Sequence, residues 1–438
     1  MTLTASNMRI EQLPPAALRP RPGNPRTHSA KQIQQIADSI ATFGFNNPIL
    51  VDEQQQIIAG HGRWEAARLL KLESVPVVCL AHMSADQVRA YVIADNKLAE
   101  NSGWDKELLK FEINAILEFD PEFSLEILGF DTPELDVLFG EGKIPAQEVA
   151  VEPSGPAVSR LGDMWVIGEH RILCGDALCP TSYKTLLGAS TAKAAFTDPP
   201  YNVPIKGHVG GSGKIQHREF VMASGEMSAD EFQAFLKTTC ERLAEVLTPG
   251  GIAFVCMDWR GALPLQRAAE GVFSELKNLC VWDKGVGGMG SLYRSQHELV
   301  FVFKAGKQAH TNNIELGRHG RNRTNVWSYS GVLARRGELA LHPTVKPVSM
   351  VADAIRDVTK RGDIVLDPFA GSGSTLLAAH RTKRRGYAIE LDPLYVDVAV
   401  RRLESETGER AILATSGETF EECAARAVTG DIRIPPDD

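Results

Sequence analysis

Residues 364–380 read IVLDPFAGSGSTLLAAH, which we interpret as a buried strand, a glycine-rich turn and a helix. Gly371 and Gly373 would let the backbone approach a ligand closely. The turn lacks the Gly-Lys-Ser/Thr ending of a phosphate loop, and Leu376 stands where a dinucleotide site needs a third glycine. The segment therefore predicts a ligand without phosphates, whose carboxylate would lie near the helix N-terminus.

The surrounding sequence alternates short apolar runs with helical patterns, which predicts a doubly wound α/β sheet. The apolar runs are residues 194–197, 252–255, 299–302, 364–366 and 387–389. Glu390 ends the last of them, roughly 20 residues after the glycine turn, where an acidic side chain reaches ribose hydroxyls in Rossmann-like folds. Asp392 is a second candidate for this role. S-adenosylmethionine, with its methionine carboxylate and ribose, suits such a site.

A second segment, Asp198-Pro199-Pro200-Tyr201, follows the apolar run 194–197. In open α/β sheets, ligands bind at this carboxyl edge. Two prolines remove two N–H donors, so carbonyls and a carboxylate remain as hydrogen-bond acceptors. Asp198 and the Pro199 carbonyl could hold an aromatic amino group, and Tyr201 could stack on a base extruded from a duplex. The alternative interpretation is an ordinary Asp-Pro turn.

Composition indicates a globular chain of 438 residues with 43% hydrophobic and 23% charged residues, which is long enough for two or three domains. The seven cysteines are scattered and form no Cys-x-x-Cys pair, which favours reduced thiols in the cytoplasm and argues against structural zinc. No membrane span or signal pattern is expected. The net charge of −8 disfavours DNA binding unless basic residues cluster locally.

The domains that we predict are residues 1–140, a linker over 141–157, a larger domain over 158–415 and a flexible tail over 416–438. Three prolines and no hydrophobic period mark the linker. We find no convincing helix-turn-helix after the first domain.

The larger domain resembles the amino-group DNA methyltransferases of the permuted (beta-type) order, in which a DPPY motif precedes an FAGSG motif. Further matches are Gly175-Asp176-Ala177-Leu178, a Pro-Gly-Gly turn at 249–251, the segment 282–298 and His342-Pro-Thr-Val-Lys346-Pro. The resemblance implies a Rossmann-like S-adenosylmethionine-dependent domain that needs no metal. It implies catalysis by Asp198, Pro199, Pro200 and Tyr201. It implies cofactor binding by Asp367, Phe369, Gly371, Ser372, Gly373, Glu390, Asp176, Ala177, His342 and Lys346.

In this family, Asp at the first catalytic position usually accompanies adenine N6 and Ser accompanies cytosine N4. Target recognition commonly lies in the interval that is 304–341 here, which contains a basic cluster at 318–323. The DNA contacts that we predict are Arg294, His297, Arg318, Arg321 and Arg323. The glycine-rich segment 207–217 is a candidate loop for gripping a DNA strand.

The first domain resembles the N-terminal domain of the ParB family, an α+β domain smaller than the methyltransferase. Gly60, Arg63 and Ala66 fit the family's Gly-x-x-Arg-x-x-Ala box, so Gly60 and Arg63 are candidate contacts to a nucleoside triphosphate. His61-Gly62 replaces the family's more frequent Glu-Arg. This departure leaves open a recruitment or DNA-clamping role without nucleotide.

The function that we expect is site-specific transfer of a methyl group from S-adenosylmethionine to adenine N6 in double-stranded DNA. The alternatives are a cytosine-N4 DNA methyltransferase, or a ParB-like DNA-binding module with an inactive methyltransferase domain. An enzyme acting on RNA or on a protein amide is a third alternative. Methyltransferases of this order often form homodimers.

Overall fold

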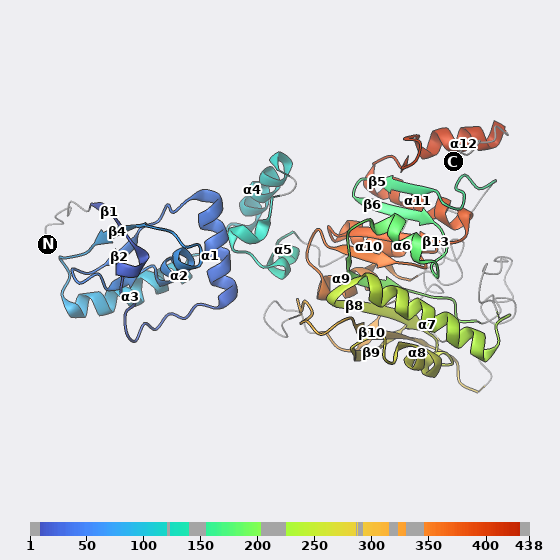
Figure 1. Cartoon of the computed structure of the whole chain (residues 1–438), viewed down its shortest axis with the longest axis horizontal. Coiled ribbons are helices and arrows are strands. Elements are labelled where there is room, and N and C mark those ends of the chain that lie inside the picture. Colours follow the sequence, from blue (N-terminus) through green and yellow to red (C-terminus); the bar gives the residue numbers. More distant parts are fainter. Residues whose placement is uncertain are drawn as a thin grey trace. The chain divides into compact units, whose positions relative to one another are not determined.

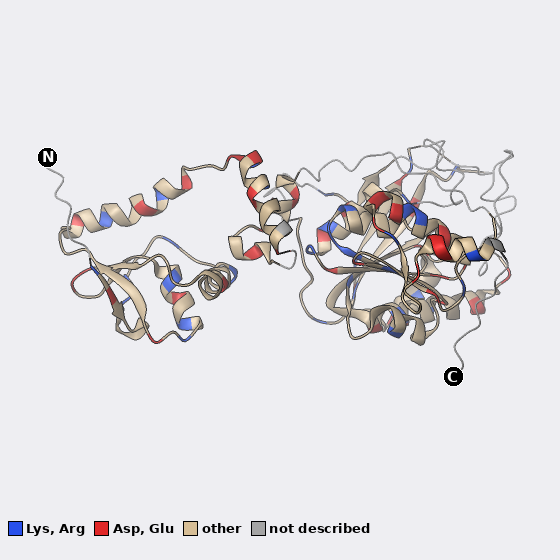
Figure 2. Ribbon diagram, turned by 90° about the horizontal axis from the view of Figure 1, so that it is seen from above, with Lys and Arg blue, Asp and Glu red and all other residues tan. Residues whose placement is uncertain are grey.

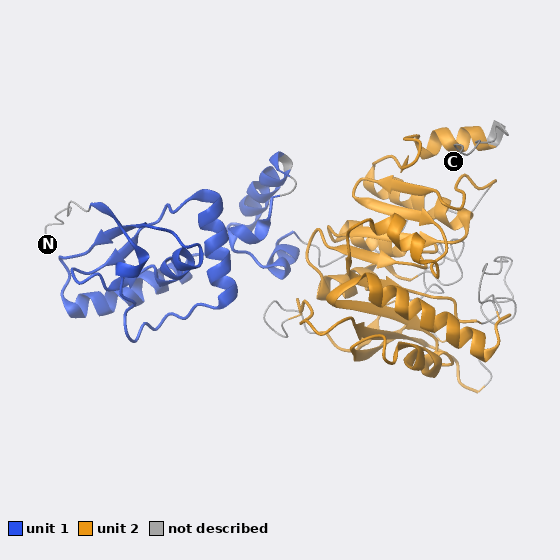
Figure 3. Ribbon diagram, viewed as in Figure 1, with its two compact units in different colours: residues 1–139 blue, residues 140–438 orange. Residues whose placement is uncertain are grey.

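The computed structural model describes residues 9–120, 123–139, 155–202, 225–285, 287, 292–314, 323–329 and 346–429. His342, Arg318, Arg321 and the glycine-rich segment 207–217 lie outside these residues. The chain divides into two compact units, residues 1–139 and 140–438 (Figure 3). Within the described ranges, no helix is long and apolar enough to cross a membrane.

Unit 1 is built on a four-stranded sheet in the order β1-β4-β2-β3 (Figure 1). Its strands are β1 (Ile10–Leu13), β2 (Ile49–Val51), β3 (Ile57–Ala59) and β4 (Val75–Cys79). The helices beside it are α1 (Ala30–Phe43), α2 (His61–Leu69) and α3 (Ala85–Glu100). The mixture of strands and helices confirms the small α+β domain.

The end of unit 1 is helical and has a small core of its own. It contains α4 (Lys106–Phe119), a 3₁₀ turn (Leu125–Leu128) and α5 (Thr132–Leu138). Ile113, Leu125 and Leu135 are buried together. The side chain of Asp105, the N-cap of α4, accepts hydrogen bonds from the backbone N–H groups of Glu107 and Leu108. These bonds fix the start of the helix.

Unit 2 contains a ten-stranded sheet in the order β11-β9-β10-β8-β7-β12-β13-β6-β5-β14. Its central strands run parallel, and they are β8 (Leu247–Met257), β7 (Ala192–Thr197), β12 (Ile364–Asp367), β13 (Arg385–Glu390) and β6 (His170–Cys174). The flanking strands are β5 (Met164–Ile167), β9 (Glu275–Asp283), β10 (His297–Lys304), β11 (Val326–Ser328) and β14 (Ile412–Leu413). Every expected apolar run lies in one of these strands.

Helices cover both faces of this sheet, because buried strands alternate their side chains between two cores. One core takes side chains from α6 (Pro180–Leu187), α7 (Ala229–Val246) and α8 (Ala262–Ala269). The other takes them from α9 (Val348–Val358), α10 (Ser374–Arg381) and α11 (Pro393–Thr407). Ala195 enters the first core and Phe196 the second. The predicted doubly wound α/β, Rossmann-like fold is confirmed.

The expectation of a flexible tail from residue 416 is wrong for its first part. Residues Phe420–Thr429 form α12, and Phe420 and Cys423 are buried. The Phe420 ring packs edge-on against Trp165, with ring centroids 5.1 Å apart. This helix has six apolar residues, but three of them are alanines, and only Phe420 and Cys423 are buried among its described side chains.

Candidate active site

The candidate site residues gather at the carboxyl edge of four neighbouring strands. Asp198 follows β7, Asp367 ends β12 and Glu390 ends β13. Asp176 lies two residues beyond β6, and Gly175 N donates a 2.9 Å hydrogen bond to the Glu390 carbonyl oxygen. The strand order β7-β12-β13-β6 therefore places the catalytic candidates directly beside the cofactor candidates.

The glycine turn after β12 is anchored on both sides. Gly371 N donates a 2.7 Å hydrogen bond to Glu390 Oε2. Gly373 is the N-cap of α10 with φ +82°, and a Cβ there would lie 2.8 Å from the Ala399 Cβ. Gly373 is thus required by close packing on α11 and by its left-handed backbone. Its requirement does not depend on a ligand.

Ser372 and Phe369 direct their side chains into the protein. Arg402 Nη1 lies 2.9 Å from the Ser372 hydroxyl and donates to the Ser372 carbonyl at 2.6 Å. The Phe369 ring packs edge-on against Phe235 of α7, with centroids 5.8 Å apart. Ser372 and Phe369, both predicted cofactor contacts, thus also connect the glycine turn to α11 and α7.

A buried carboxyl group, that of Asp367, and a half-buried one, that of Glu390, flank the glycine turn. Asp367 accepts hydrogen bonds from Thr375 Oγ1 at 2.6 Å and from Phe369 N at 3.1 Å, and burial raises its pKa to about 6. Burial likewise raises the pKa of Glu390 to about 7, although the Asp392 and Gly371 N–H groups oppose the shift. Glu390 is therefore poised to change charge near neutral pH.

Asp176 and Ala177 form a tight turn beside Glu390. Asp176 Oδ1 accepts a 2.8 Å hydrogen bond from Leu178 N, and the Ala177 carbonyl accepts one of 2.8 Å from the Tyr183 hydroxyl. Asp392, the second candidate for a ribose contact, instead caps α11 by accepting from Leu394 N. The Glu390 carboxylate likewise accepts from backbone N–H groups, those of Gly371 and Asp392, so both candidates for the ribose contact stay open.

Four side chains form a cluster around the catalytic candidates Asp198 and Tyr201, and we call Asp198, Tyr201, Glu298 and Lys346 the catalytic cluster. The Tyr201 hydroxyl contacts one oxygen of Asp198 and Glu298 Oε1. The Lys346 ammonium contacts the other Asp198 oxygen and lies 3.3 Å from Glu298 Oε1. Two carboxylates therefore share one ammonium and one hydroxyl.

The two carboxyl groups of the catalytic cluster have opposite pKa shifts. Burial raises the pKa of Asp198, with the Glu298 charge adding to the effect and Lys346 opposing it. Burial disfavours the charged form of Glu298 too, but the ammoniums of Lys346 and Lys284 hold its pKa at about 2. Burial together with the two carboxylates raises the pKa of the Tyr201 phenol, which stays protonated. Divergent shifts of this kind separate a proton acceptor from a permanent anion.

Asn202 supports the candidate catalytic segment 198–201, a role that sequence reasoning did not assign. Its backbone has φ +56°, which asparagine tolerates better than most residues. Its amide donates to the Met227 carbonyl at 2.8 Å and accepts from Gly225 N at 3.0 Å. Asn202 therefore ties Tyr201 to the chain just before α7.

The predicted DNA contacts differ in their surroundings. His297 starts β10 with an exposed side chain, and Arg294 is exposed and donates to the Gly287 carbonyl at 2.5 Å. β10 runs antiparallel to β8, so His297 and Arg294 lie at the same edge as Asp198. Arg323 instead lies 3.1 Å from Asp357 and 3.3 Å from Asp353. Arg323 thus forms ion pairs within unit 2, and its contact with DNA stays a prediction.

Two further residues at this edge were missed by sequence reasoning. Glu298 is only 5% exposed, and the signal for it was a carboxylate at the start of the apolar run HELVFVFK. Trp259 follows β8 with 60% of its surface exposed, and the Arg260 guanidinium lies 5.4 Å from its ring. Exposed aromatic rings stack on bases in proteins that bind single-stranded nucleic acid, which makes Trp259 a candidate for a DNA contact.

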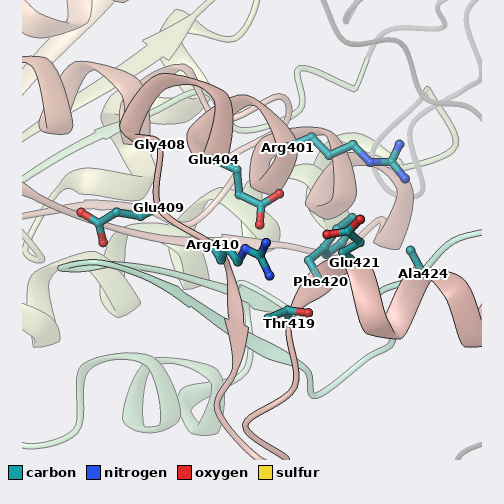
Figure 4. A pocket seen from close by; sticks show the side chains of 9 residues that line it. All are labelled: Arg401, Glu404, Gly408, Glu409, Arg410, Thr419, Phe420, Glu421 and Ala424. Atoms are coloured by element: carbon teal, nitrogen blue, oxygen red, sulfur yellow. The ribbon is translucent and has the colours of Figure 1, made fainter.

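Charged side chains of both signs are interspersed along the helices of both units (Figure 2). One cavity of about 410 Å³ lies between the end of α11 and the start of α12 (Figure 4). Its lining includes Arg401, Arg410, Glu404 and Glu421, and none of the candidate site residues. This cavity is therefore separate from the catalytic cluster.

In unit 1, Gly60 is the N-cap of α2, with φ +102°. Arg63 Nη2 donates to the Pro48 carbonyl at 3.3 Å, and a Cβ on Gly60 would lie 3.0 Å from the Arg63 guanidinium. Both candidate nucleotide contacts thus lie together at one helix N-terminus, with Arg63 folded against the protein. Nucleotide binding there stays a prediction.

Comparisons with known proteins match each part of the chain. Family models match the ParB N-terminal domain over residues 1–96, the ParB-methyltransferase HTH domain over 107–161 and the DNA methylase family over 192–401. The chain joins a ParB N-terminal domain to a DNA methylase domain of the N6/N4 family. The resemblances drawn from the sequence are confirmed.

The HTH match corrects our expectation that no helix-turn-helix follows the first domain. The matched segment includes α4 and α5. α5 has only seven residues, and a 3₁₀ helix lies between α4 and α5, which obscured the pattern in the sequence.

Individual relatives agree with these families. The ParB-like nuclease domain-containing protein YnaK of Escherichia coli is 45% identical over 83 residues, which are 19% of this chain and 95% of that protein. The type II methyltransferase M.HpaI of Haemophilus parainfluenzae is 25% identical over 54% of this chain and 75% of its own length.

Solved structures are also similar. The M1.HpyAVI complex with SAM is 21% identical, covering 53% of this chain and 98% of that one, with a TM-score of 0.39. The cytosine-N4-specific PvuII DNA methyltransferase is 17% identical, and the match covers 60% of this chain and 94% of that one, with a TM-score of 0.41.

Proposed function

We propose that this DNA methyltransferase transfers a methyl group from S-adenosylmethionine to adenine N6 in double-stranded DNA. The observation that carries the proposal is the position of Asp198-Pro199-Pro200-Tyr201 at the sheet edge, beside the glycine turn and Glu390. An aspartate at the first catalytic position favours adenine over cytosine.

The cofactor candidates suit S-adenosylmethionine. Glu390 carries a carboxylate that can accept hydrogen bonds from ribose hydroxyls. The α10 N-terminus presents backbone N–H groups to a carboxylate. When bound, the cofactor supplies an electrophilic methyl group on a sulfonium.

The amino nitrogen of adenine is a weak nucleophile, because its lone pair is conjugated with the ring. Asp198 and the Pro199 carbonyl accept hydrogen bonds from the two amino hydrogens, which favours a pyramidal nitrogen. Tyr201 stacks on the extruded base. Asp198 and Pro199 would hold the amino nitrogen facing the methyl group that the bound cofactor would supply, and the Asp198 carboxylate would accept the proton that the nitrogen loses on methylation. Catalysis then rests on positioning and electrostatics.

The DNA would contact the catalytic edge through Arg294, His297 and the exposed Trp259. The ParB-like unit and its HTH-matched helices supply a second contact to duplex DNA. Without such contacts, a chain with a net charge of −8 would have little attraction for phosphates.

The experiment is to incubate the full chain with tritiated S-adenosylmethionine and mixed-sequence duplex DNA, and then to identify the labelled nucleoside. We expect label in N6-methyladenine, and its loss in Asp198→Ala. Label in N4-methylcytosine would keep the proposed mechanism and change the target base to cytosine. Tight DNA binding with no label would support a DNA-binding protein with an inactive methyltransferase domain.

A further inference from the structure

Glu298 occupies a position that the reaction scheme above does not use. It lies on β10 opposite Trp282 of β9, at the edge where Asp198 follows β7. Its Oε2 lies 3.0 Å from Lys284 Nζ, and its Oε1 contacts both Lys346 and the Tyr201 hydroxyl. Glu298 is only 5% exposed, so its ionised carboxylate depends on its three polar partners. Loss of any one of them would leave part of a buried charge uncompensated, which is unfavourable.

The contacts of Tyr201 show what Glu298 can do. A phenol has one proton to donate, yet the Tyr201 oxygen contacts both Asp198 and Glu298. When the proton is donated to Glu298, one Asp198 oxygen has no donor from Tyr201. That oxygen is then available to the amino group of the base.

Lys346 is divided between the same two acceptors. Its ammonium contacts Asp198 and lies 3.3 Å from Glu298, and no other cation among the described residues is paired with Asp198. A lysine paired with Asp198 alone would weaken that carboxylate as a hydrogen-bond acceptor. Competition from Glu298 limits this pairing.

We propose that Glu298 is a positioning residue for methyl transfer, which draws the Lys346 ammonium and the Tyr201 proton away from Asp198 and keeps Asp198 able to accept. The proposal rests on the catalytic role proposed for Asp198. Lys284, at 34% side-chain exposure, balances the Glu298 charge from the solvent side. The balance of cations on Glu298 therefore sets how strongly it competes with Asp198.

The other ionisable groups facing Asp198 are Cys256 of β8 and Asp367 of β12. Burial raises the pKa of the Cys256 thiol well above neutral pH, so it stays uncharged. Asp367 raises the pKa of Asp198 only when Asp367 is itself ionised. Asp367 is unchanged in the Glu298 and Lys284 variants, so its effect on Asp198 is the same in all of them. Neither group can imitate the effect of changing Glu298.

The test measures kcat against pH, from about pH 5 to 9, at saturating cofactor and DNA. In Glu298→Gln, Lys346 pairs with Asp198 alone and a negative neighbour is lost. We expect kcat to fall about tenfold and the acid limb of the profile to move down by about one pH unit. The dissociation constant for S-adenosylmethionine should change less than about threefold.

In Lys284→Met, the acid limb of the kcat profile should shift in the opposite direction. With Lys284 gone, Glu298 competes more strongly for Lys346, and a cation near Asp198 is lost. The acid limb should therefore move to higher pH. The control Glu275→Gln changes an exposed carboxylate on the neighbouring strand β9 and should move neither kcat nor the limb.

The proposal is overturned if the acid limb of the kcat profile does not move in Glu298→Gln. It is also overturned if the limb moves in the same direction in Glu298→Gln and Lys284→Met. A loss of kcat explained by a lower unfolding temperature alone would do the same. If the wild-type chain labels no base, the proposed function fails instead. Wild-type activity with unaffected variants would leave that function standing and reject the role of Glu298.

Discussion

Arg402 Nη1 donates a 2.6 Å hydrogen bond to the Ser372 carbonyl oxygen and lies 2.9 Å from the Ser372 hydroxyl. Arg402 is only 1% exposed, so a buried cation on α11 holds the glycine turn from beneath. The turn is therefore shaped before any ligand arrives. Ser372 contributes to that shape through both its backbone and its side chain.

Arg402→Met should loosen this turn while it keeps a long apolar stem. We expect S-adenosylmethionine to bind about tenfold more weakly and the unfolding free energy to fall by about 1–3 kcal/mol. Ser372→Ala, the matched control, removes only the hydroxyl contact and should have a smaller effect. Isothermal titration and thermal unfolding measure both quantities. A larger loss of affinity in Ser372→Ala would mean that its hydroxyl contacts the ligand directly.

Asp198→Asn should lower kcat by about 10²- to 10³-fold, because a neutral amide polarises the target amino group less than a carboxylate. Cofactor affinity should stay within about twofold, since the glycine turn and Glu390 are unchanged. Single-turnover methylation and cofactor titration separate the two effects. Near-normal turnover in this variant would remove Asp198 from the mechanism.

Glu390→Gln should abolish a pH dependence of cofactor binding. Burial raises the pKa of Glu390 to about 7, so its carboxylate is mostly protonated below neutral pH. The ionised form is the better acceptor for ribose hydroxyls, and wild-type affinity should therefore rise as pH increases from about 6 to 8. The glutamine variant should bind more weakly, with a flat profile over this range. A pH-dependent profile in Glu390→Gln would assign the titration to another group.

His170 should make unit 2 sensitive to acid. Its Nδ1 accepts from Gly386 N at 2.9 Å and its Nε2 lies 3.3 Å from His380 Nδ1. Burial and the neighbouring His380 lower the pKa of His170 to about 4 from 6.5. The unfolded chain therefore binds the proton first, and stability falls as pH drops from about 6.5 to 4.

The His170 contribution to this loss is at most about 3 kcal/mol. His170→Asn retains an acceptor for Gly386 N–H and removes the titration, so its stability should fall less over that range. Denaturant unfolding of both proteins at several pH values measures the difference. Equal losses in the two proteins would assign the acid sensitivity elsewhere.

Trp259→Ala should raise the KM for DNA about three- to tenfold without changing cofactor binding, because its exposed ring is available to stack on a base or sugar. The fold should be unaffected, since 60% of the side chain is exposed. Leu263→Ala, which is 56% exposed on α8, is the matched control and should leave the KM unchanged. Equal KM values for wild type and Trp259→Ala would place the DNA elsewhere on this edge.

The sequence by itself determined the doubly wound fold, because buried strands such as 194–197 and 364–366 are continuous apolar runs and the turn between strand and helix carries its glycines. It also predicted that the candidates Asp198, Tyr201 and Glu390 lie at the carboxyl edge of the sheet, because each stands at or just after the end of a strand. These features are local, and each depends on a few consecutive residues.

Only the tertiary structure decided which partners these residues have. Glu298 and Lys346 are 48 residues apart, yet they contact each other, and Lys346 also contacts Asp198. Arg323 appears basic in its local context, yet it pairs with Asp357, and Ser372 turns toward Arg402 on another helix. Burial and pairing across the sheet set the charge states at this edge, and no local pattern encodes which distant side chain will neutralise a buried charge.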